Sequence, residues 1–314
     1  MNILSLFDGV SCGQVASERV GFKIDNYFAS EIESNPMKAT QDNYPNTIQL
    51  GDINKVDLGK LPRIDLILAG SPCQGFSRGG KGLNFDDPRS CLFFKFIDIL
   101  NEIRSNNNPD VKFLLENVEM KKEWRDVITE YIGVEPIAIN SVLLIPQSRP
   151  RTYWTNIEGV VAPESNGMKL KDILENVDTS SYIDYKELKI DPSISEKSMK
   201  LIDNVNGEIR ISQATKLGYI VAENGDGINL GFPTSKTRRG RVLKGKSSCL
   251  DCSCNIQVYI NGVIRNLTIN ELEKLQTLPV SYTKILPEAA RKKAIGNGWT
   301  VDVIVWILSF LTIK

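Results

Sequence analysis

The sequence predicts a doubly wound α/β domain, in which helices cover both faces of a mainly parallel sheet, followed by a second, smaller domain. Short apolar runs alternate with helical stretches in the first half of the chain. The runs 64–69 and 111–115 are of the kind found in parallel strands that are buried on both faces. From about Thr179 the pattern changes to short strands separated by turn signals such as Asn261-Gly262.

The elements of the first domain can be predicted one by one. Apolar residues predict strands at 2–7 and 26–30, and each is followed by a stretch with helical spacing, at 14–20 and 35–43. Between the two buried strands, Cys91 to Leu100 has the wide apolar face of a helix. The run Asn106-Asn107-Asn108-Pro109 then ends this unit.

The last stretch, Pro287 to Ile313, returns to helix and apolar density, so we expect it to pack back onto the first domain. The predicted first domain is therefore residues 1–178, completed by 287–314. The predicted second domain is residues 179–286.

Composition restricts the classes of function. The 38 Lys and Arg residues equal the 38 Asp and Glu residues, so any nucleic-acid contact must be local. The chain has no His, which excludes Ser/His or Cys/His catalysis and metal sites that contain His. Its six cysteines follow no regular spacing, which favours a reducing cytosol. We find no secretory signal and no apolar stretch long enough to span a bilayer, and we expect a cytoplasmic protein.

Chemistry-bearing residues follow several of the predicted strands. Cys73 lies on a loop at the carboxyl end of the strand 64–69, where α/β sheets place their active sites. This Gly-rich loop continues through Arg78 and Lys81, and its composition suits a segment that passes close to a ligand. The thiol of Cys73 is the predicted nucleophile.

The first three strands end in residues that could bind a nucleoside. The turn after the first strand contains Gly9 and Gly13, without the spacing of the dinucleotide fingerprint. Glu31 ends the second strand and could hold ribose hydroxyls, and Asp52 follows the third and could accept a hydrogen bond from an adenine amine. Taken singly, each could equally be a turn residue or a solvated strand end.

Two further sites strengthen this interpretation. Glu116 ends the strand 111–115 at the same sheet edge as Cys73. Arg149 and Arg151 precede another apolar segment, which would aim both guanidiniums toward that edge if it is a strand. A thiol, a carboxyl and a positioned Arg without His suit attack on C6 of a pyrimidine rather than hydrolysis.

Other residues have two readings. Cys249, Cys252 and Cys254 could form half of a zinc site, but no second cluster supplies the remaining ligands, so we predict no metal. Cys12 and Cys91 are predicted to be small buried residues. The phenylalanines of the helix that begins at Cys91 could stack on bases, but their helical spacing favours a place in the core; they are Phe93, Phe94 and Phe96.

The run 236–246 is basic and contains no acid. It could be a solvated loop, but its place inside the second domain favours contacts with phosphates and bases. The residues assigned to DNA binding are Arg238, Arg239, Arg241, Lys244 and Lys246, together with Arg78 and Lys81.

The chain resembles the cytosine-C5 DNA methyltransferases over nearly its whole length. The motifs occur in that family's order: Phe7-Asp8-Gly9-Val10-Ser11-Cys12-Gly13, Glu31, Gly51-Asp52-Ile53, Pro72-Cys73-Gln74, Glu116-Asn117-Val118, Gln147-x-Arg149-x-Arg151, Arg265-x-Leu267 with Glu271-x-x-x-Leu275-Gln276-x-x-Pro279, and Gly296-Asn297-Gly298-Trp299.

The resemblance implies an S-adenosylmethionine-dependent, Rossmann-like methyltransferase domain with a target-recognition domain. The residues implied in binding the cofactor are Phe7, Gly9, Val10, Gly13, Glu31, Ile32, Asp52, Ile53, Pro72 and Asn297, and those implied in acting on the base are Cys73, Glu116, Arg149 and Arg151. Ile32 stands where many bacterial members carry Trp. Trp299 stands at a position where the animal de novo branch of the family also has Trp.

The implied reaction is transfer of a methyl group from S-adenosylmethionine to C5 of a flipped-out cytosine in duplex DNA, through a covalent bond between Cys73 and C6 and with S-adenosylhomocysteine as product. Without His, water or a carboxylate must accept the proton from C5. The alternatives are a tRNA cytosine methyltransferase, whose Cys-Phe-Thr triplet is absent, and a catalytically silent regulatory relative. We expect a stand-alone monomer of a bacterial or phage-infected cell, with double-stranded DNA as partner and no obligate protein partner.

Overall fold

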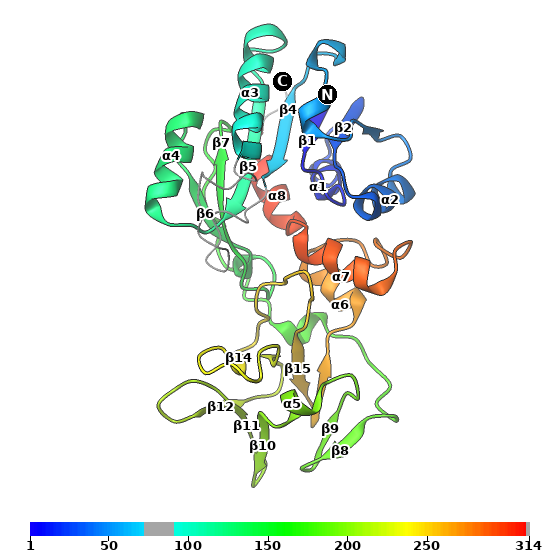
Figure 1. The fold of residues 1–314 in the computed structure, drawn as a ribbon, viewed down its shortest axis with the longest axis vertical. Coiled ribbons are helices and arrows are strands. Elements are labelled where there is room, and N and C mark those ends of the chain that lie inside the picture. Colours follow the sequence, from blue (N-terminus) through cyan, green and yellow to red (C-terminus); the bar gives the residue numbers. More distant parts are fainter. Residues whose placement is uncertain (72–90, 312–314) are drawn as a thin grey trace.

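A computed structural model describes residues 1–71 and 91–311 (Figure 1). Its larger region is built on a seven-stranded sheet of order β3-β2-β1-β4-β5-β7-β6. The strands are β1 (Asn2–Leu6), β2 (Asn26–Ser30), β3 (Ile48–Gln49), β4 (Leu66–Gly70), β5 (Lys112–Val118), β6 (Ile137–Asn140) and β7 (Pro150–Thr155). All pairs from β3 to β5 are parallel, whereas β7 runs antiparallel to both β5 and β6.

Helices cover both faces of this sheet, as predicted for a doubly wound fold. They are α1 (Cys12–Val20), α2 (Ser34–Asn43), α3 (Cys91–Asn106), α4 (Lys122–Ile132) and α8 (Val301–Leu308), whereas α7 (Glu288–Asn297) lies beyond the sheet and contacts α2. Alternate residues of β4 enter different cores, because side chains alternate across a strand. Leu68 packs in the core with residues of α1 and α8, and Ile67 packs in the core with Phe93 and Phe96 of α3. Phe93 and Phe96 are therefore core residues, as predicted.

The predicted elements shift slightly at their ends. The strand predicted at 64–69 begins at Leu66, and the helix predicted to end near Leu100 continues to Asn106. Asn107 and Asn108 explain the entry into β4: the Asn107 side chain accepts a hydrogen bond from the Ile64 amide at 2.7 Å, and the Asn108 side chain donates to the Ile64 carbonyl at 2.8 Å. The asparagine run thus holds the chain beside the sheet before β4 begins.

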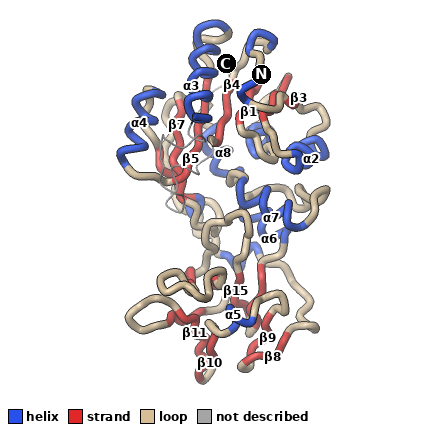
Figure 2. The backbone as a smooth tube through the Cα atoms, viewed as in Figure 1, coloured by secondary structure: helices blue, strands red, loops and turns tan. Residues whose placement is uncertain are grey.

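The second region, residues 183–266, consists of short strands and long loops (Figure 2). Strands β10 (Ile202–Val205), β11 (Glu208–Ser212) and β12 (Tyr219–Ala222) form a three-stranded sheet. A six-stranded sheet has the order β14-β13-β15-β16-β9-β8; its strands are β8 (Ile183–Tyr185), β9 (Leu188–Ile190), β13 (Asp226–Asn229), β14 (Arg241–Leu243), β15 (Gln257–Ile260) and β16 (Val263–Asn266). With the short helix α5 (Glu196–Met199), these strands enclose a separate apolar core.

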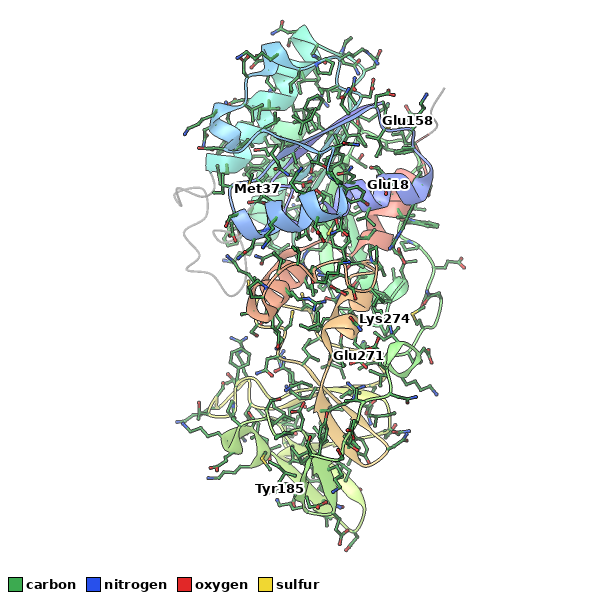
Figure 3. All side chains as sticks on the ribbon, turned by 90° about the vertical axis from the view of Figure 1, so that its right-hand side faces the viewer. Glu18, Met37, Glu158, Tyr185, Glu271 and Lys274 are labelled. Atoms are coloured by element: carbon green, nitrogen blue, oxygen red, sulfur yellow. The ribbon has the colours of Figure 1, made fainter. Side chains whose placement is uncertain are left out.

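A buried ion pair marks the junction between the two regions. Both guanidinium Nη atoms of Arg265 in β16 bind the carboxylate of Glu271 at 2.8 and 2.7 Å. Glu271 belongs to α6 (Ile269–Leu275), and Figure 3 shows it with Lys274 between the regions, whereas Tyr185 lies at the far end of the second one. Glu175 completes the junction, because its carbonyl accepts from Arg265 and its carboxylate pairs with Lys274.

The last helix of the described chain, α8, lies against the first region. Helix α8 packs on α1, and its Ile304 and Ile307 lie in the same core as Leu68. Four short 3-10 helices complete the described elements, at Ile53–Lys55, Leu58–Lys60, Ser141–Leu143 and Leu170–Ile173. None of the helices in the described ranges is long and apolar enough to cross a membrane.

Candidate active site

A cavity of about 540 Å³ opens where β1, β2, β4 and β5 end. The residues assigned to the cofactor or the base that line it are Phe7, Gly9, Val10, Glu31, Ile32, Asp52, Ile53, Glu116, Arg149, Arg151 and Asn297. The cavity is also lined by Asp8 and Trp299, which the sequence analysis assigned to no role. Pro72, Cys73, Arg78 and Lys81 lie outside the described residues.

The turn after β1 shapes one end of the cavity. Phe7, Gly9 and Ser11 all have positive φ, so the chain coils tightly before α1 begins. Gly13 is needed for packing rather than as a lining residue, because an added Cβ would lie 2.6 Å from Leu68 and 2.9 Å from the Tyr27 hydroxyl.

Two carboxylates at this end are oriented by the backbone. Glu31 accepts hydrogen bonds from the amides of Gly9 (2.8 Å), Ile32 (2.7 Å) and Glu33 (2.8 Å). Asp52 accepts from the backbone and side chain of Asn54 through Oδ1, at 3.0 Å each. Both carboxylates are therefore held in place at the cavity wall, with acceptor capacity remaining for a ligand.

Asp8 is a third carboxylate at the cavity. Its oxygens accept hydrogen bonds from Ser11 Oγ and from the Tyr27 hydroxyl, the latter at 2.9 Å. Burial, with a smaller contribution from nearby Glu31, raises the pKa of Asp8 to about 6 against the lowering effect of its hydrogen bonds. Sequence reasoning missed Asp8 because a residue inside a glycine turn shows no sign of its burial.

The other end of the cavity holds a carboxylate bound at both oxygens. Arg151 Nε lies 2.8 Å from Oε1 of Glu116, and Trp299 Nε1 donates to Oε2 at 3.2 Å. Glu116 pairs with Gly70 in the β4–β5 register, so it stands beside the end of β4. The next residue, Ser71, is buried and bonded to Asn117 at 3.0 Å. Arg151 reaches Glu116 because β7 is a strand, as the prediction required, and pairs antiparallel with β5.

Arg149 was grouped with Arg151 in the sequence analysis, but the two guanidiniums have different partners. It is buried, and its guanidinium donates to the carbonyls of Leu250 (2.8 Å), Gly296 (3.1 Å) and Gly298 (2.9 Å). Four hydrogen-bond acceptors surround it once Cys249 Sγ, at 3.3 Å, is included. Although Arg149 also borders the cavity, its donors join the loop after β14 to the end of α7.

The cysteines of residues 249–254 contact this same part of the fold. Cys249 lies near both Arg149 and Arg151, and Cys252 Sγ donates to Asn297 Oδ1 at 3.1 Å. Cys254 is buried, as is Cys12. Within residues 1–71 and 91–311, no group of three or more Cys, Asp or Glu side chains could hold a metal ion.

The basic residues of 236–246 differ in their surroundings. The guanidinium of Arg238 lies 4.0 Å from the ring centre of Phe232, and both side chains are exposed. Lys244, assigned to DNA binding with Arg239, Arg241 and Lys246, is paired with Glu223 at 2.9 Å and Asp226 at 3.1 Å. These ion pairs tie Lys244 to its own region.

Three comparisons place the chain among known proteins. The model of the family "C-5 cytosine-specific DNA methylase" matches residues 1–130 and 140–311. The type II methyltransferase M.NgoBI of Neisseria gonorrhoeae is 26% identical over 96% of this chain and 90% of that protein. The type II methyltransferase M.NgoBV of the same organism is 32% identical over 64% of this chain. The orphan methyltransferase M.SPRI of Bacillus phage SPR is 32% identical over 56% of this chain. The matched segments span about half the length of the last two relatives, 53% and 42%.

Solved structures show the same fold. A putative DNA modification methyltransferase encoded within an E. coli prophage superposes with a TM-score of 0.64 at 19% identity, covering 99% of this chain and 98% of the other. A mutant of Spodoptera frugiperda DNMT2 gives a TM-score of 0.61 at 17% identity, covering 98% of each chain. Since the family model matches nearly the whole chain, this protein belongs to the C-5 cytosine-specific DNA methylase family.

Proposed function

We propose that the protein is a DNA (cytosine-C5) methyltransferase that uses S-adenosylmethionine. One observation carries the proposal: a single cavity has the carboxylates of Glu31 and Asp52 at one end and the Glu116–Arg151 pair at the other. A nucleoside-containing donor and a pyrimidine could therefore meet in one space.

The residues at the first end fit S-adenosylmethionine. We assign Glu31 to the ribose hydroxyls, because three backbone amides already orient its carboxylate. Asp52 is assigned to the adenine amine, and Asp8 supplies negative charge for the cationic donor. When bound, the cofactor would supply an electrophilic methyl group to C5 of the base.

The second end fits a cytosine that has left the DNA stack. A stacked base admits no nucleophile to C6, so the base must be extruded at a cost of about a few kcal/mol. We assign Glu116 to N3 and the exocyclic amine, and Arg151 to the orientation of Glu116 and to O2 of the base. Together they stabilise the charge that develops on the ring.

Cys73 is assigned as nucleophile from the sequence. It follows Ser71 by two residues, so the covalent chain keeps its Cα within about 7 Å of the Cα of Ser71. Its thiolate forms the bond to C6 while electrons move toward N3, and elimination of Cys73 follows loss of the C5 proton to water or a carboxylate. Arg149 is assigned a positioning role.

Residues 179–286 are assigned to target recognition. The support is the exposed basic side chains of this region, among them Arg238 and Arg241. Arg pairs with guanine edges, whereas Lys and Arg on phosphates add affinity without sequence preference.

Methyl transfer from labelled S-adenosylmethionine tests the function. We expect incorporation into duplex DNA and none into tRNA. Incorporation into tRNA alone would replace the proposal by the RNA enzyme, and none into either substrate would favour a silent relative.

Trapping on 5-fluorocytosine tests the nucleophile. Duplex DNA carrying the analogue at the target should form an irreversible adduct, because fluorine cannot leave as a proton does. Cys73→Ala should abolish the adduct while DNA binding is retained, and the control Cys252→Ala should still form it. An adduct that persists in Cys73→Ala would remove Cys73 from this role.

A further inference from the structure

Trp299 lines the cavity and packs beside two glycines, Gly70 and Gly13. An added Cβ at Gly70 would lie 2.8 Å from Nε1 of Trp299 and 3.2 Å from Cε2 and Cζ2. At Gly13 it would lie 3.6 Å from Cζ3. The indole therefore occupies space that only glycine leaves open at Gly70 of β4, and it lies within van der Waals distance of Gly13 in α1, so packing restricts its orientation.

The indole presents its single donor to Glu116. Trp299 Nε1 donates to Oε2 at 3.2 Å, while Arg151 Nε holds Oε1 at 2.8 Å. A glutamate has three side-chain torsions, so one bound oxygen would still let the carboxylate turn. With both oxygens bound from opposite elements, β7 and the segment before α8, the carboxylate has one orientation.

We propose that Trp299 is a positioning residue that acts through Glu116: its N–H and the Arg151 guanidinium together hold the carboxylate in the orientation that the base requires. The inference rests on the proposed function and adds a residue to its machinery. Misorientation of a reacting group lowers the rate of the chemical step more than it lowers substrate binding.

Two other indoles offer controls for this contact. Trp306 Nε1 donates to the Val161 carbonyl at 2.7 Å, and Trp154 Nε1 donates to Thr129 Oγ1 at 3.0 Å. Neither Trp306 nor Trp154 lines the cavity. Trp306→Phe therefore removes an indole N–H without touching the site.

The first test is single-turnover methyl transfer by Trp299→Phe, which keeps an aromatic ring and removes the donor. We expect the rate constant to fall about tenfold, as for a lost hydrogen bond to a charged group, with cofactor Kd changed less than about twofold. Trp306→Phe should match the wild type. An unchanged rate in Trp299→Phe, with or without weaker cofactor binding, would contradict the proposal and show that Trp299 only lines the cavity.

Gly70→Ala provides a second variant. Its Cβ would displace the Nε1 atom of Trp299, while the indole itself stays chemically unchanged. We expect the same loss of rate as in Trp299→Phe. If Trp299→Phe does not fold, Gly70→Ala alone decides the matter, and a wild-type rate in it contradicts the proposal.

Fluorescence tests the contact without any reaction. The emission of Trp299 is the difference between the wild type and Trp299→Phe, and Glu116→Gln should shift it, whereas the same substitution in the Trp299→Phe background should change nothing. Absence of a shift would overturn the contact. If the wild type methylates no DNA, the proposed function fails, but this difference still reports on Trp299 and Glu116.

Discussion

Arg149 binds the carbonyl oxygen of Gly298 at 2.9 Å and thereby fixes the end of α7 to the strand that carries Arg151. The same guanidinium binds Leu250, so one buried cation joins three segments that are far apart in the sequence. Arg149 therefore governs where Trp299, the next residue after Gly298, can lie.

Arg149→Lys should lower the free energy of unfolding by about 2 kcal/mol, because an ammonium group cannot supply the fork that meets these carbonyls. Denaturant unfolding measures the change. Arg19→Lys is the matched control, since Arg19 pairs with Asp302 on the surface, and we expect it to cost less than about 0.5 kcal/mol. Equal effects of the two substitutions would contradict the role of Arg149.

Asp52→Ala should weaken binding of S-adenosylmethionine by about 1–3 kcal/mol, the range for one buried hydrogen bond. Turnover at saturating cofactor should change much less. Asp57→Ala is the control, because Asp57 caps its own short helix by accepting from the Gly59 amide and does not line the cavity. Calorimetry that gives one affinity for both variants would remove Asp52 from the site.

Cofactor affinity should depend on the protonation of Asp8, whose pKa is raised to about 6 by burial. Above that pH the carboxylate is charged and attracts the cationic cofactor; well below it, affinity should fall by up to about tenfold per pH unit. Asp8→Asn should remove this dependence between about pH 5 and about pH 8. A wild-type affinity that is flat across this range would contradict the assignment.

Folding stability should respond to Asp8 with the opposite sign. The pKa of Asp8 in the folded protein lies above its ordinary value of 3.8, so the folded state binds the proton more tightly than the unfolded state. The charged group therefore costs stability above about pH 6, and this cost is relieved as the pH falls toward about 4. Asp8→Asn should gain stability relative to the wild type at neutral pH, in thermal unfolding without cofactor.

Substitutions in residues 236–246 should separate sequence reading from phosphate binding. At least one of Arg238→Ala, Arg239→Ala and Arg241→Ala should relax the methylated sequence, since a bidentate Arg contributes about 1–3 kcal/mol of discrimination per base. Lys246→Ala should weaken all sites alike and flatten the salt dependence. Methylation of a random-sequence library measures both; wild-type patterns in all three Arg variants would place base reading elsewhere.

Lys244 gives a different expectation from the other basic residues, because its amine is already paired with Glu223 and Asp226. Lys244→Ala should alter DNA affinity less than Lys246→Ala. Filter binding at several salt concentrations compares the two variants, and a larger loss in Lys244→Ala would show that its ion pairs open on DNA.

The pattern of apolar residues predicted the strands and helices of the first region well, because it depends only on residues that are close in the sequence. The apolar strands and amphipathic helices appear near their predicted positions, since strand alternation and helical spacing are properties of adjacent residues. Predicted strand-end residues such as Glu31, Asp52 and Glu116 line the cavity, because parallel strands end at one edge, whereas Gly13 does not line it. The antiparallel direction of β7 could not be predicted, since it depends on pairing with β5 rather than on its own residues.

The differences between Arg149 and Arg151, and between Lys244 and Lys246, depend on partners that are remote in the sequence. Arg149 meets Gly296, 147 residues away, and Lys244 meets Asp226 because β14 pairs with β13. Trp299 gave a signal as an unusual residue after Gly298, but only the structure brings its N–H to Glu116. The sequence shows which residue types stand at the strand ends. Which of their hydrogen-bond donors remain available for a ligand depends on tertiary packing.

Arg265 binds both the Glu271 carboxylate and the Glu175 carbonyl. These contacts hold the segment before the second region beside the segment that follows it. When the two ends of a segment are held together, its loops can change in length while the ends keep their positions on the rest of the fold. We therefore expect chimaeras joined at Glu175 and Arg265 to carry target preference between relatives only where residues 249–252, which contact Arg149 and Asn297, are retained.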